Sequence, residues 1–204
     1  MSPKPEDIYT ALKGVKFLDL NKTRKNVVKL NARSIGKKPT RKALDMVRDK
    51  ISSSKKARFS GVFGKIANPT SKWKPVQSAL SRKYPKVHKM LFAYVKAHAP
   101  PGFKFDCITV NHNLKCKKHV DSKNSPVSLI TAVGNYTGGE LCLQDPKSKK
   151  IKVCDTKNKF LLYNGKEWKH WNKTIKGDKY SIIAYYRYGK GKDNIPPTEP
   201  KWIK

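Results

Sequence analysis

The chain has 204 residues, enough for one domain with a substantial core, and 37% of its residues are hydrophobic and 10% aromatic. This composition excludes a disordered basic tail. No apolar run approaches the roughly 18–20 residues that cross a bilayer, and the N-terminal stretch MSPKPEDIYTALKG lacks the apolar core of a signal peptide. We therefore expect an intracellular protein, in the nucleus, the cytoplasm or a viral context, without a membrane partner.

Charge is the strongest feature of the composition, since 46 lysine and arginine residues stand against 14 acidic residues, for a net charge of +32. Such an excess repels itself in a compact state unless polyanions or salt screen it. It favours a nucleic acid partner bound through phosphates. A lysine-rich proteome or a virion packing protein would give the same composition, and lysine outnumbers arginine, the residue that reads base edges.

The first half of the chain is basic and predicted to be largely helical. Positive charges are dense from Lys22 to Arg58, where residues 40–52 carry apolar side chains at helical spacing and Thr40 is placed to cap the helix. The segment GVFGKIANP breaks this pattern with two glycines and a proline. Residues 75–100 predict a second helix that restarts near Pro85. We expect its two histidines, at 88 and 98, to be boundary residues rather than metal ligands.

After residue 102 the chain changes to short runs rich in β-branched and aromatic residues, separated by turn signals. Strands are predicted within 103–113, 127–136, 139–145, 150–156, 159–165 and 179–188, which is typical of a sandwich or barrel. Three of the four cysteines lie in these runs and are expected to be buried free thiols: Cys107, Cys142 and Cys154. The proline- and lysine-rich end reads as a tail.

We therefore divide the chain into three parts. Residues 1–60 form a basic extension, 61–190 form the main domain, with a helical lead-in to about 100 and a β core at 103–188, and 191–204 form the tail.

A constellation with metal-ligand chemistry lies in the second half. His119 and Asp121 are two residues apart after a predicted strand, and His170 follows some fifty residues later between two others. Two imidazoles and one carboxylate match the facial triad that holds Fe(II) and leaves positions open. The pair alone would read as an incidental ion pair in a polar loop. Cys116 is close enough in sequence to join a zinc site, but no second cysteine pair completes one.

A second element follows nine residues after His170. The run KYSIIAYY begins with Lys179 and carries Ser181, and alternate residues of a strand share one face. A cation at the start of an inner strand, with a hydroxyl two residues on, suits the far carboxylate of 2-oxoglutarate. The alternative is one more solvated lysine.

These motifs together resemble the Fe(II)/2-oxoglutarate dioxygenase superfamily. The likeness runs through ITVNHNLKCKKHVDSKN, VSLITAVGNYTGGELCLQD and HWNKTIKGDKYSIIAYY, from about Phe103 to Tyr186, and more weakly back through residues 84–105. GNYTGGELCL, followed by a histidine and a [RK]-Y-S strand, looks most like the branch that oxidises nucleobases. This branch includes the TET methylcytosine oxygenases, the thymine hydroxylases of base J synthesis and related viral proteins.

The resemblance implies an α+β fold: a double-stranded β-helix, or jelly-roll, core with a basic, largely helical N-terminal part packed on it. It implies iron ligation by His119, Asp121 and His170, with Fe(II) and 2-oxoglutarate as cofactors and ascorbate as an optional reductant. The residues implied at the cosubstrate are Lys179, supported by Ser181, and the polar pair Asn111 and Asn113.

One departure bears on the substrate. Base-oxidising members generally have arginine at the position of Lys179, whereas lysine there is familiar from prolyl and lysyl hydroxylases, and Arg187 is the alternative cation on the same strand. We expect a dioxygenase that hydroxylates a pyrimidine methyl group in DNA or RNA. A prolyl- or lysyl-type protein hydroxylase and a non-catalytic nucleic-acid-binding or packaging protein on a degenerate fold are the alternatives.

Overall fold

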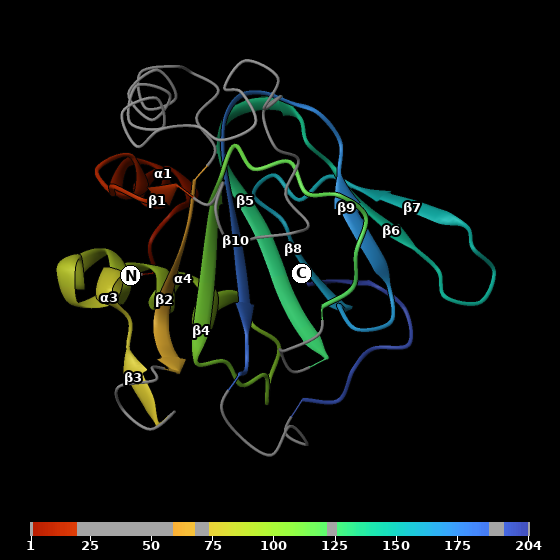
Figure 1. The fold of residues 1–204 in the computed structure, drawn as a ribbon, viewed down its shortest axis with the longest axis horizontal. Coiled ribbons are helices and arrows are strands. Elements are labelled where there is room, and N and C mark those ends of the chain that lie inside the picture. Colours follow the sequence, from red (N-terminus) through yellow and green to blue (C-terminus); the bar gives the residue numbers. More distant parts are fainter. Residues whose placement is uncertain (1, 20–58, 68–73, 122–125, 188–193, 204) are drawn as a thin grey trace, which may run out of the picture.

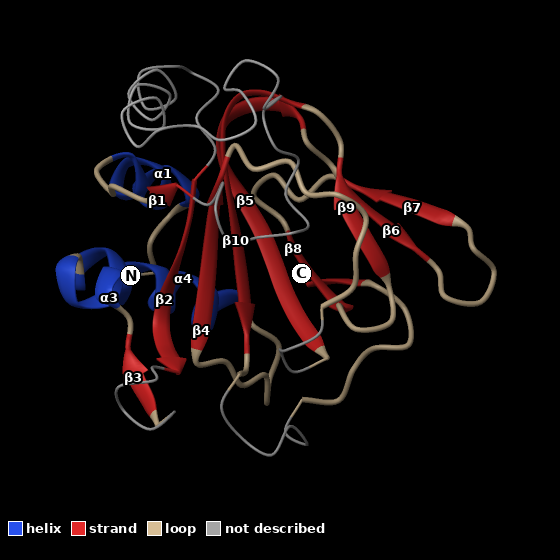
Figure 2. Ribbon diagram, viewed as in Figure 1, coloured by secondary structure: helices blue, strands red, loops and turns tan. Residues whose placement is uncertain are grey.

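The protein is seen here in a computed structural model, which describes residues 2–19, 59–67, 74–121, 126–187 and 194–203. In the described part, two antiparallel sheets lie side by side and helices cover one of them (Figures 1 and 2). No helix among these residues is long and apolar enough to cross a membrane. Helices packed on one of two antiparallel sheets make the fold α+β with a jelly-roll-like β core, as the sequence predicts.

The large sheet has the strand order β1-β2-β4-β10-β5-β8-β11, and β3 pairs with β2. The bounds of its strands are Leu18–Asp19 (β1), Phe59–Ala67 (β2), Pro75–Gln77 (β3), Cys107–His112 (β4), Val127–Gly138 (β5), Phe160–Asn164 (β8), Ile175–Tyr185 (β10) and Lys201–Ile203 (β11). The small sheet has the order β7-β6-β9, with bounds Ile151–Cys154 (β7), Leu141–Gln144 (β6) and Lys169–Asn172 (β9).

Three helices pack on the face of the large sheet that is turned away from the small sheet: α1 (Pro5–Lys13), α3 (Ala79–Lys83) and α4 (Pro85–His98). Proline at the first turn suits α1 and α4, because that N–H has no helical partner. Ser78 caps α3 by accepting a hydrogen bond from the backbone N–H of Ser81 at 3.1 Å. The predicted second helix is thus confirmed in its main part, with the restart at Pro85.

Alternation along the strands separates two apolar layers. In β10, Tyr180 and Ile182 pack with the helices, whereas Ile183 packs against the cluster between the sheets that holds Leu143 and Trp168. Lys179 and Ser181 share the face of Ile183, so the alternation that the sequence predicts for this strand directs both of them to the space between the sheets.

The sheets extend beyond the predicted strands. Where glycines predict a break, β2 pairs with β4 along its length. A Cβ at Gly61 would lie 2.1 Å from Leu80, and Gly64 has φ +96° against the carbonyl of Asp106, so these glycines mark close packing within a strand. The predicted tail contributes β11, which pairs with β8. The helix predicted at residues 40–52 lies outside the described residues.

The expectation of a largely helical lead-in is therefore wrong in part. Between residues 59 and 100 the structure has two helices and also the strands β2 and β3, and β2 belongs to the large sheet. The physical reason is that β2 covers the edge of β4, whose backbone groups would otherwise stay unpaired.

Candidate metal centre

Three side chains with metal-ligand chemistry converge at the junction of the two sheets. His119, Asp121 and His170 present ligand atoms that all lie within 4.8 Å of one another. Asp121 Oδ1 lies 3.9 Å from Nε2 of His119 and 3.8 Å from Nε2 of His170. The sequence separates His170 from the other two by some fifty residues, so only the fold brings the three together.

Backbone pairing holds the two histidines side by side. The N–H of His119 donates to the carbonyl of His170 at 3.1 Å, and the N–H of His170 donates to the carbonyl of His119 at 2.7 Å. Their ring centroids are 4.3 Å apart. His170 lies within β9, a strand that the sequence does not predict, rather than between two strands. β9 has four residues, and the other three are lysine, tryptophan and asparagine, so it has no run of β-branched residues.

Both imidazoles are oriented by the same contact. Nδ1 of His119 lies 2.7 Å from the carbonyl of Lys117, and Nδ1 of His170 lies 3.0 Å from the carbonyl of Trp168. A carbonyl only accepts, so each Nδ1 carries the proton and each Nε2 lone pair is free on the side of Asp121. Second partners of this kind fix the tautomer of metal-binding histidines.

Asp121 is held by a close approach of two backbone segments. Its N–H donates to the carbonyl of Gly165 at 2.8 Å, and a Cβ at position 165 would lie 2.7 Å from Asp121 Oδ2. Glycine is therefore required at position 165, directly after β8, because any side chain there would meet the carboxylate of Asp121. The sequence predicts the turn but not its contact with the carboxylate.

Burial keeps His170 in the form that binds metal. Burial lowers the pKa of His170, the neighbouring His119 acts in the same direction, and the carboxylate of Asp121 opposes both. His170 is consequently neutral at neutral pH. Its ring also meets Tyr163 edge-on, with 5.4 Å between centroids, which closes the apolar side of the site.

Lys179 is buried between the sheets, with only 3% of its surface exposed. Its Nζ donates to the carbonyl of Gly139 and lies 5.2 Å from the centroid of the Tyr136 ring. Burial lowers its pKa to about 8, and the nearby carboxylates of Asp155 and Glu140 counter part of that effect. Lys179 is thus not one of the solvated lysines.

Polar groups without partners lie on the same inner face. The hydroxyl of Tyr136 and Oδ1 of Asn111 are buried and accept or donate no hydrogen bond among the described residues. Burial raises the pKa of Tyr136, as do Asp155 and Glu140, so its hydroxyl stays a donor. Lys157 approaches this ring too, at 5.0 Å from its centroid. Sequence reasoning missed Lys157, which has no motif around it.

The other predicted site residues divide into two groups. Ser181 and Asn111 are register partners in β10 and β4 and share the inner face with Lys179. Asn113 serves the backbone: its Oδ1 accepts from the N–H of Lys179 at 2.8 Å, and its own N–H donates to the carbonyl of Lys179 at 2.9 Å.

Arg187 lies beyond the opposite end of β10. Its N–H donates to Asp106 Oδ1 at 2.9 Å, and six residues of strand, about 20 Å, separate Lys179 from Tyr185. The fold therefore puts Lys179, and not Arg187, on the stretch of β10 that meets Gly139.

The cysteines and distant histidines behave as expected. Cys107, Cys142 and Cys154 are buried free thiols in strands, and Cys116 does not belong to the metal-ligand group. His88 contacts Ser81 at 3.2 Å and His98 stacks on Phe160, both on the helix side.

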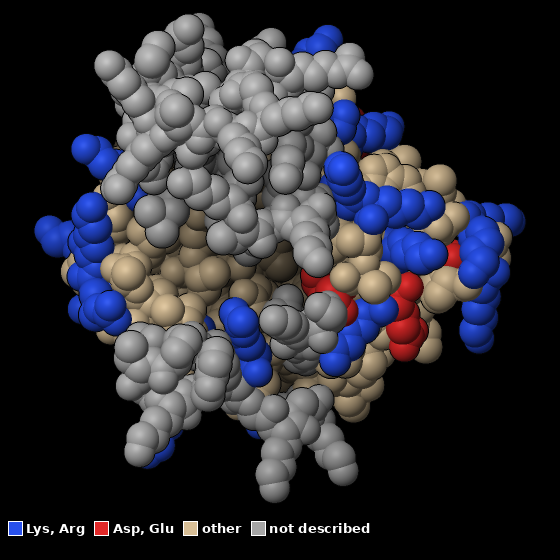
Figure 3. Space-filling model, viewed as in Figure 1, with Lys and Arg blue, Asp and Glu red and all other residues tan. Residues whose placement is uncertain are grey.

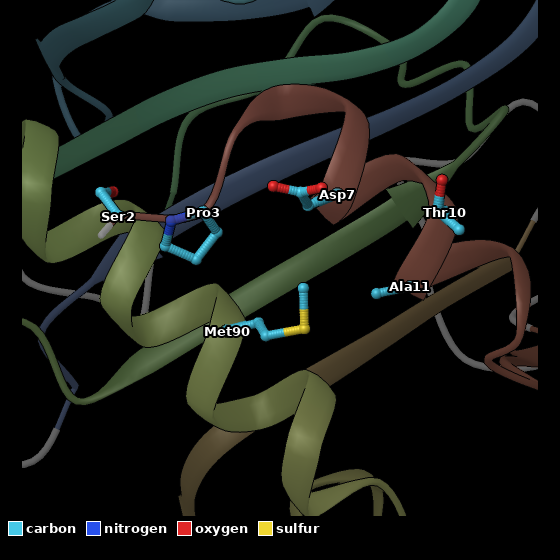
Figure 4. Close-up of a pocket in the computed structure, with 6 residues that line it drawn as sticks. All are labelled: Ser2, Pro3, Asp7, Thr10, Ala11 and Met90. Atoms are coloured by element: carbon cyan, nitrogen blue, oxygen red, sulfur yellow. The ribbon is translucent and has the colours of Figure 1, made fainter.

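A separate surface pocket of about 500 Å³ opens between α1 and α4. It is lined by Ser2, Pro3, Asp7, Thr10, Ala11 and Met90 (Figure 4). The helices that form it cover the face of the large sheet opposite to the metal-ligand group, so this pocket is not part of the site.

No protein-family model and no curated protein match the chain, whereas solved structures do. A Pseudomonas putida prolyl-4-hydroxylase is 12% identical, with 78% of this chain and 89% of that chain covered and a TM-score of 0.39. A 2OG-Fe(II) oxygenase family protein from Burkholderia pseudomallei is 12% identical, with 96% of both chains covered and a TM-score of 0.44. NgTET1 in complex with 5mC DNA is 15% identical, with 76% and 71% covered and a TM-score of 0.43.

Proposed function

We propose that this protein is an Fe(II)- and 2-oxoglutarate-dependent dioxygenase. The observation that carries the proposal is the convergence of two oriented Nε2 atoms and one carboxylate within 4.8 Å, at the edge of an interior that also buries a lysine. Three protein ligands of this composition are typical of mononuclear iron that keeps open coordination positions.

The three residues fit a metal ion. Both histidines have their Nδ1 proton engaged by a backbone carbonyl, burial keeps His170 neutral, and Asp121 supplies one negative charge. No described residue hydrogen-bonds Nε2 of either histidine, and Asp121 Oδ1 lies 3.9 Å from Nε2 of His119 and 3.8 Å from Nε2 of His170. His119, Asp121 and His170 would hold the iron, which with 2-oxoglutarate supplies the activation of dioxygen for hydroxylation.

The interior fits a dicarboxylate. Lys179 is a buried cation whose pKa burial lowers more than the carboxylates of Asp155 and Glu140 raise it, and an anionic ligand would add the counter-charge. The ring of Tyr136, whose centroid is 5.2 Å from Lys179 Nζ, carries an unpartnered hydroxyl that can donate to a carboxylate without breaking another bond. We assign the far carboxylate of 2-oxoglutarate to Lys179 and Tyr136, with Ser181 and Asn111 along the same face.

For the substrate we propose a nucleobase in DNA or RNA, with a pyrimidine methyl group as the target. The net charge of +32 supports a polyanionic partner, and exposed lysines adjoin the metal ligands at positions 117, 118, 166 and 169. A base in a duplex would have to leave the stack to reach the site, at a cost of a few kcal/mol.

A protein hydroxylase is the second candidate. The observation that favours it is the lysine at position 179, where base-oxidising enzymes of the resembling branch generally have arginine. A non-catalytic binding protein is disfavoured by the site itself, because a degenerate fold has no need to orient both histidines and clear space for Asp121 with Gly165.

Anaerobic titration with Fe(II) and 2-oxoglutarate tests the enzyme class. We expect a weak visible metal-to-ligand charge-transfer band that His119→Ala and Asp121→Ala abolish. His98→Ala is the matched control, because His98 also places Nδ1 against a carbonyl but forms no ion pair with a carboxylate of the described residues. A band that survives both ligand substitutions, or no band in the unaltered protein, rejects the iron site.

Incubation with thymine- and methylcytosine-containing nucleic acid, followed by mass spectrometry of the nucleosides, tests the substrate. We expect a hydroxylated pyrimidine that depends on Fe(II) and 2-oxoglutarate. Succinate release with nucleic acid but without a modified nucleoside would count against base oxidation and in favour of another target.

A further inference from the structure

The small sheet has an inner face, which carries His170, and an outer face, which carries apolar side chains and lysines. In β9, His170 points to the metal-ligand group and the next residue, Trp171, points to the opposite face. The register places Trp171 beside Cys142 of β6, and Val153 of β7 follows on the far side of Cys142. The neighbouring row contains Lys169, Gln144 and Ile151 by the same register.

The segment before Asp121 continues this face past β9. His119 pairs with His170, so Lys118 stands opposite Trp171 and Val120 opposite Lys169. Nζ of Lys118 lies 4.8 Å from the Trp171 ring centroid, which confirms that the two share a face. Val120, Ile151 and Val153 are 41%, 52% and 51% exposed, and they are three of the five most exposed large hydrophobic side chains among the described residues.

Cations surround this apolar strip, which we call the outer strip and define as Val120, Ile151, Val153 and Trp171. Exposed lysines lie within it or at its margins: Lys169 in β9, Lys118 and Lys173 in the segments beside that strand, and Lys147, Lys149 and Lys150 in the loop between β6 and β7. Figure 3 shows Lys and Arg side chains gathered over the part of the molecule that Figure 1 labels β6, β7 and β9, with acidic side chains between some of them. Carboxylates also flank this sheet: Glu140 and Asp155 lie at the end where Lys173 lies, Asp145 lies in the loop between β6 and β7, and Glu167 lies just before β9.

We propose that the outer strip binds single-stranded nucleic acid, with a base stacked on Trp171 and phosphates on the flanking lysines. The inference rests on the nucleic acid part of the proposed function and is independent of the iron site. Sequence-tolerant binding of single strands combines an aromatic stacking platform with a positively charged surface, and both features occur together here.

One physical point favours a single strand over a duplex. The faces of the bases are covered by their neighbours in a duplex, whereas a single strand offers them to Trp171. Lys118, which lies over the ring in the free protein, forms an exposed cation–π contact that is weaker than base stacking. A base therefore displaces Lys118 from the ring, and the freed ammonium pairs with a phosphate.

The location links this surface to the metal ligands. His119 and Lys118 are neighbours in one segment, as are His170 and Trp171 in β9, so each pair directs one side chain to the inner face and one to the outer strip. A strand held on the outer strip consequently runs beside the segment that carries two of the three ligands.

Fluorescence anisotropy with a labelled 20-nucleotide oligothymidylate, measured without iron or 2-oxoglutarate, tests the proposal. We expect Trp171→Ala to weaken binding about tenfold and Trp171→Phe to retain most of it. The double variant Lys118→Ala/Lys169→Ala should lower the slope of log K against log salt by about 1.4, at about 0.7 per lost phosphate contact on a single strand.

The matched control is Lys86→Ala/Lys89→Ala, which removes two exposed lysines from α4 on the helix side and should leave affinity unchanged. Equal losses in the two double variants, or no loss in Trp171→Ala, would overturn the proposal. So would a dimer in sedimentation that Val153→Asp dissociates while oligothymidylate binding is unaltered, because the strip would then be an interface between copies.

The charge-transfer titration separates the two proposals. If the unaltered protein shows no band but binding follows Trp171 and the lysine pair, the oxygenase assignment fails and the outer strip stands. If the band is present in Trp171→Ala and Lys118→Ala/Lys169→Ala while their affinity for oligothymidylate equals that of the unaltered protein, the outer strip is rejected and the oxygenase assignment stands.

Discussion

Replacing Lys179 by methionine should make the protein more stable at neutral pH. Methionine keeps much of the length and volume of the lysine side chain but removes its charge. Lys179 is buried, and burial lowers its pKa from 10.5 to about 8. The folded state therefore carries a cost for the charged form that the unfolded chain does not carry.

The magnitude follows from the size of that change. Each pKa unit corresponds to about 1.4 kcal/mol, so the charged lysine costs the folded state about 3 kcal/mol below pH 8. The variant also loses the hydrogen bond from Nζ to the Gly139 carbonyl, which offsets about 1 kcal/mol. We expect a net gain of about 2 kcal/mol in the free energy of unfolding at pH 7.

The gain should depend on pH in one direction. Between pH 8 and 10.5 the unfolded chain binds the proton and the folded protein does not, so the stability of the unaltered protein rises with pH in this window. By pH 9.5 the cost of the charge falls to about 1 kcal/mol, and the difference between the two proteins should be close to zero.

Urea denaturation at pH 7.0 and 9.5 measures both values, with Lys176→Met as the control at an exposed lysine of the same strand. A variant that is less stable at pH 7, or a difference that is the same at both pH values, would refute the reasoning. The same variant should lose the stabilisation that 2-oxoglutarate gives to the iron-loaded protein, because the proposed partner of its carboxylate is absent. Lys179 would thus lower the stability of the free protein and serve ligand binding.

Three further predictions concern the site. Gly165→Ala places a Cβ 2.7 Å from Asp121 Oδ2 and should lower iron affinity at least about tenfold in a competition titration, whereas Gly14→Ala, whose nearest contact is 3.6 Å away, should leave it unaltered. Tyr136→Phe removes a buried hydroxyl that has no partner among the described residues, so stability should not fall while the 2-oxoglutarate requirement rises about tenfold; an unchanged requirement would remove Tyr136 from the cosubstrate site. Lys179→Ala should raise the 2-oxoglutarate requirement much more than Arg187→Ala in succinate-release assays, and the reverse order would move the anchor to Arg187.

The inner strands of the β core could be predicted from the sequence because each of them carries its own signal. In β4, β5, β8 and β10 runs of β-branched and aromatic residues end at turn residues, and the observed strands fall within or close to the predicted ranges. The strands that were missed lack this pattern: β9 is short, β11 follows a proline-rich segment, β2 contains glycines, and β1 and β3 have only two and three residues. Each of these forms because a partner strand is present, which no local pattern records.

The candidate ligands show the same division. His119, Asp121, His170 and Lys179 could be singled out from residue type, spacing and the period-two alternation of a strand, since these depend on the local sequence alone. Their distances, the fixed tautomers, the clearance at Gly165 and the burial of Lys179 depend on contacts between segments far apart in the chain. The sequence by itself determined which groups are available and, for Lys179 and Ser181, that both lie on one face of a strand. Only the tertiary structure decided that three of them meet, that one lysine among many is desolvated, and that Trp171 turns away from the metal ligands to the outer face.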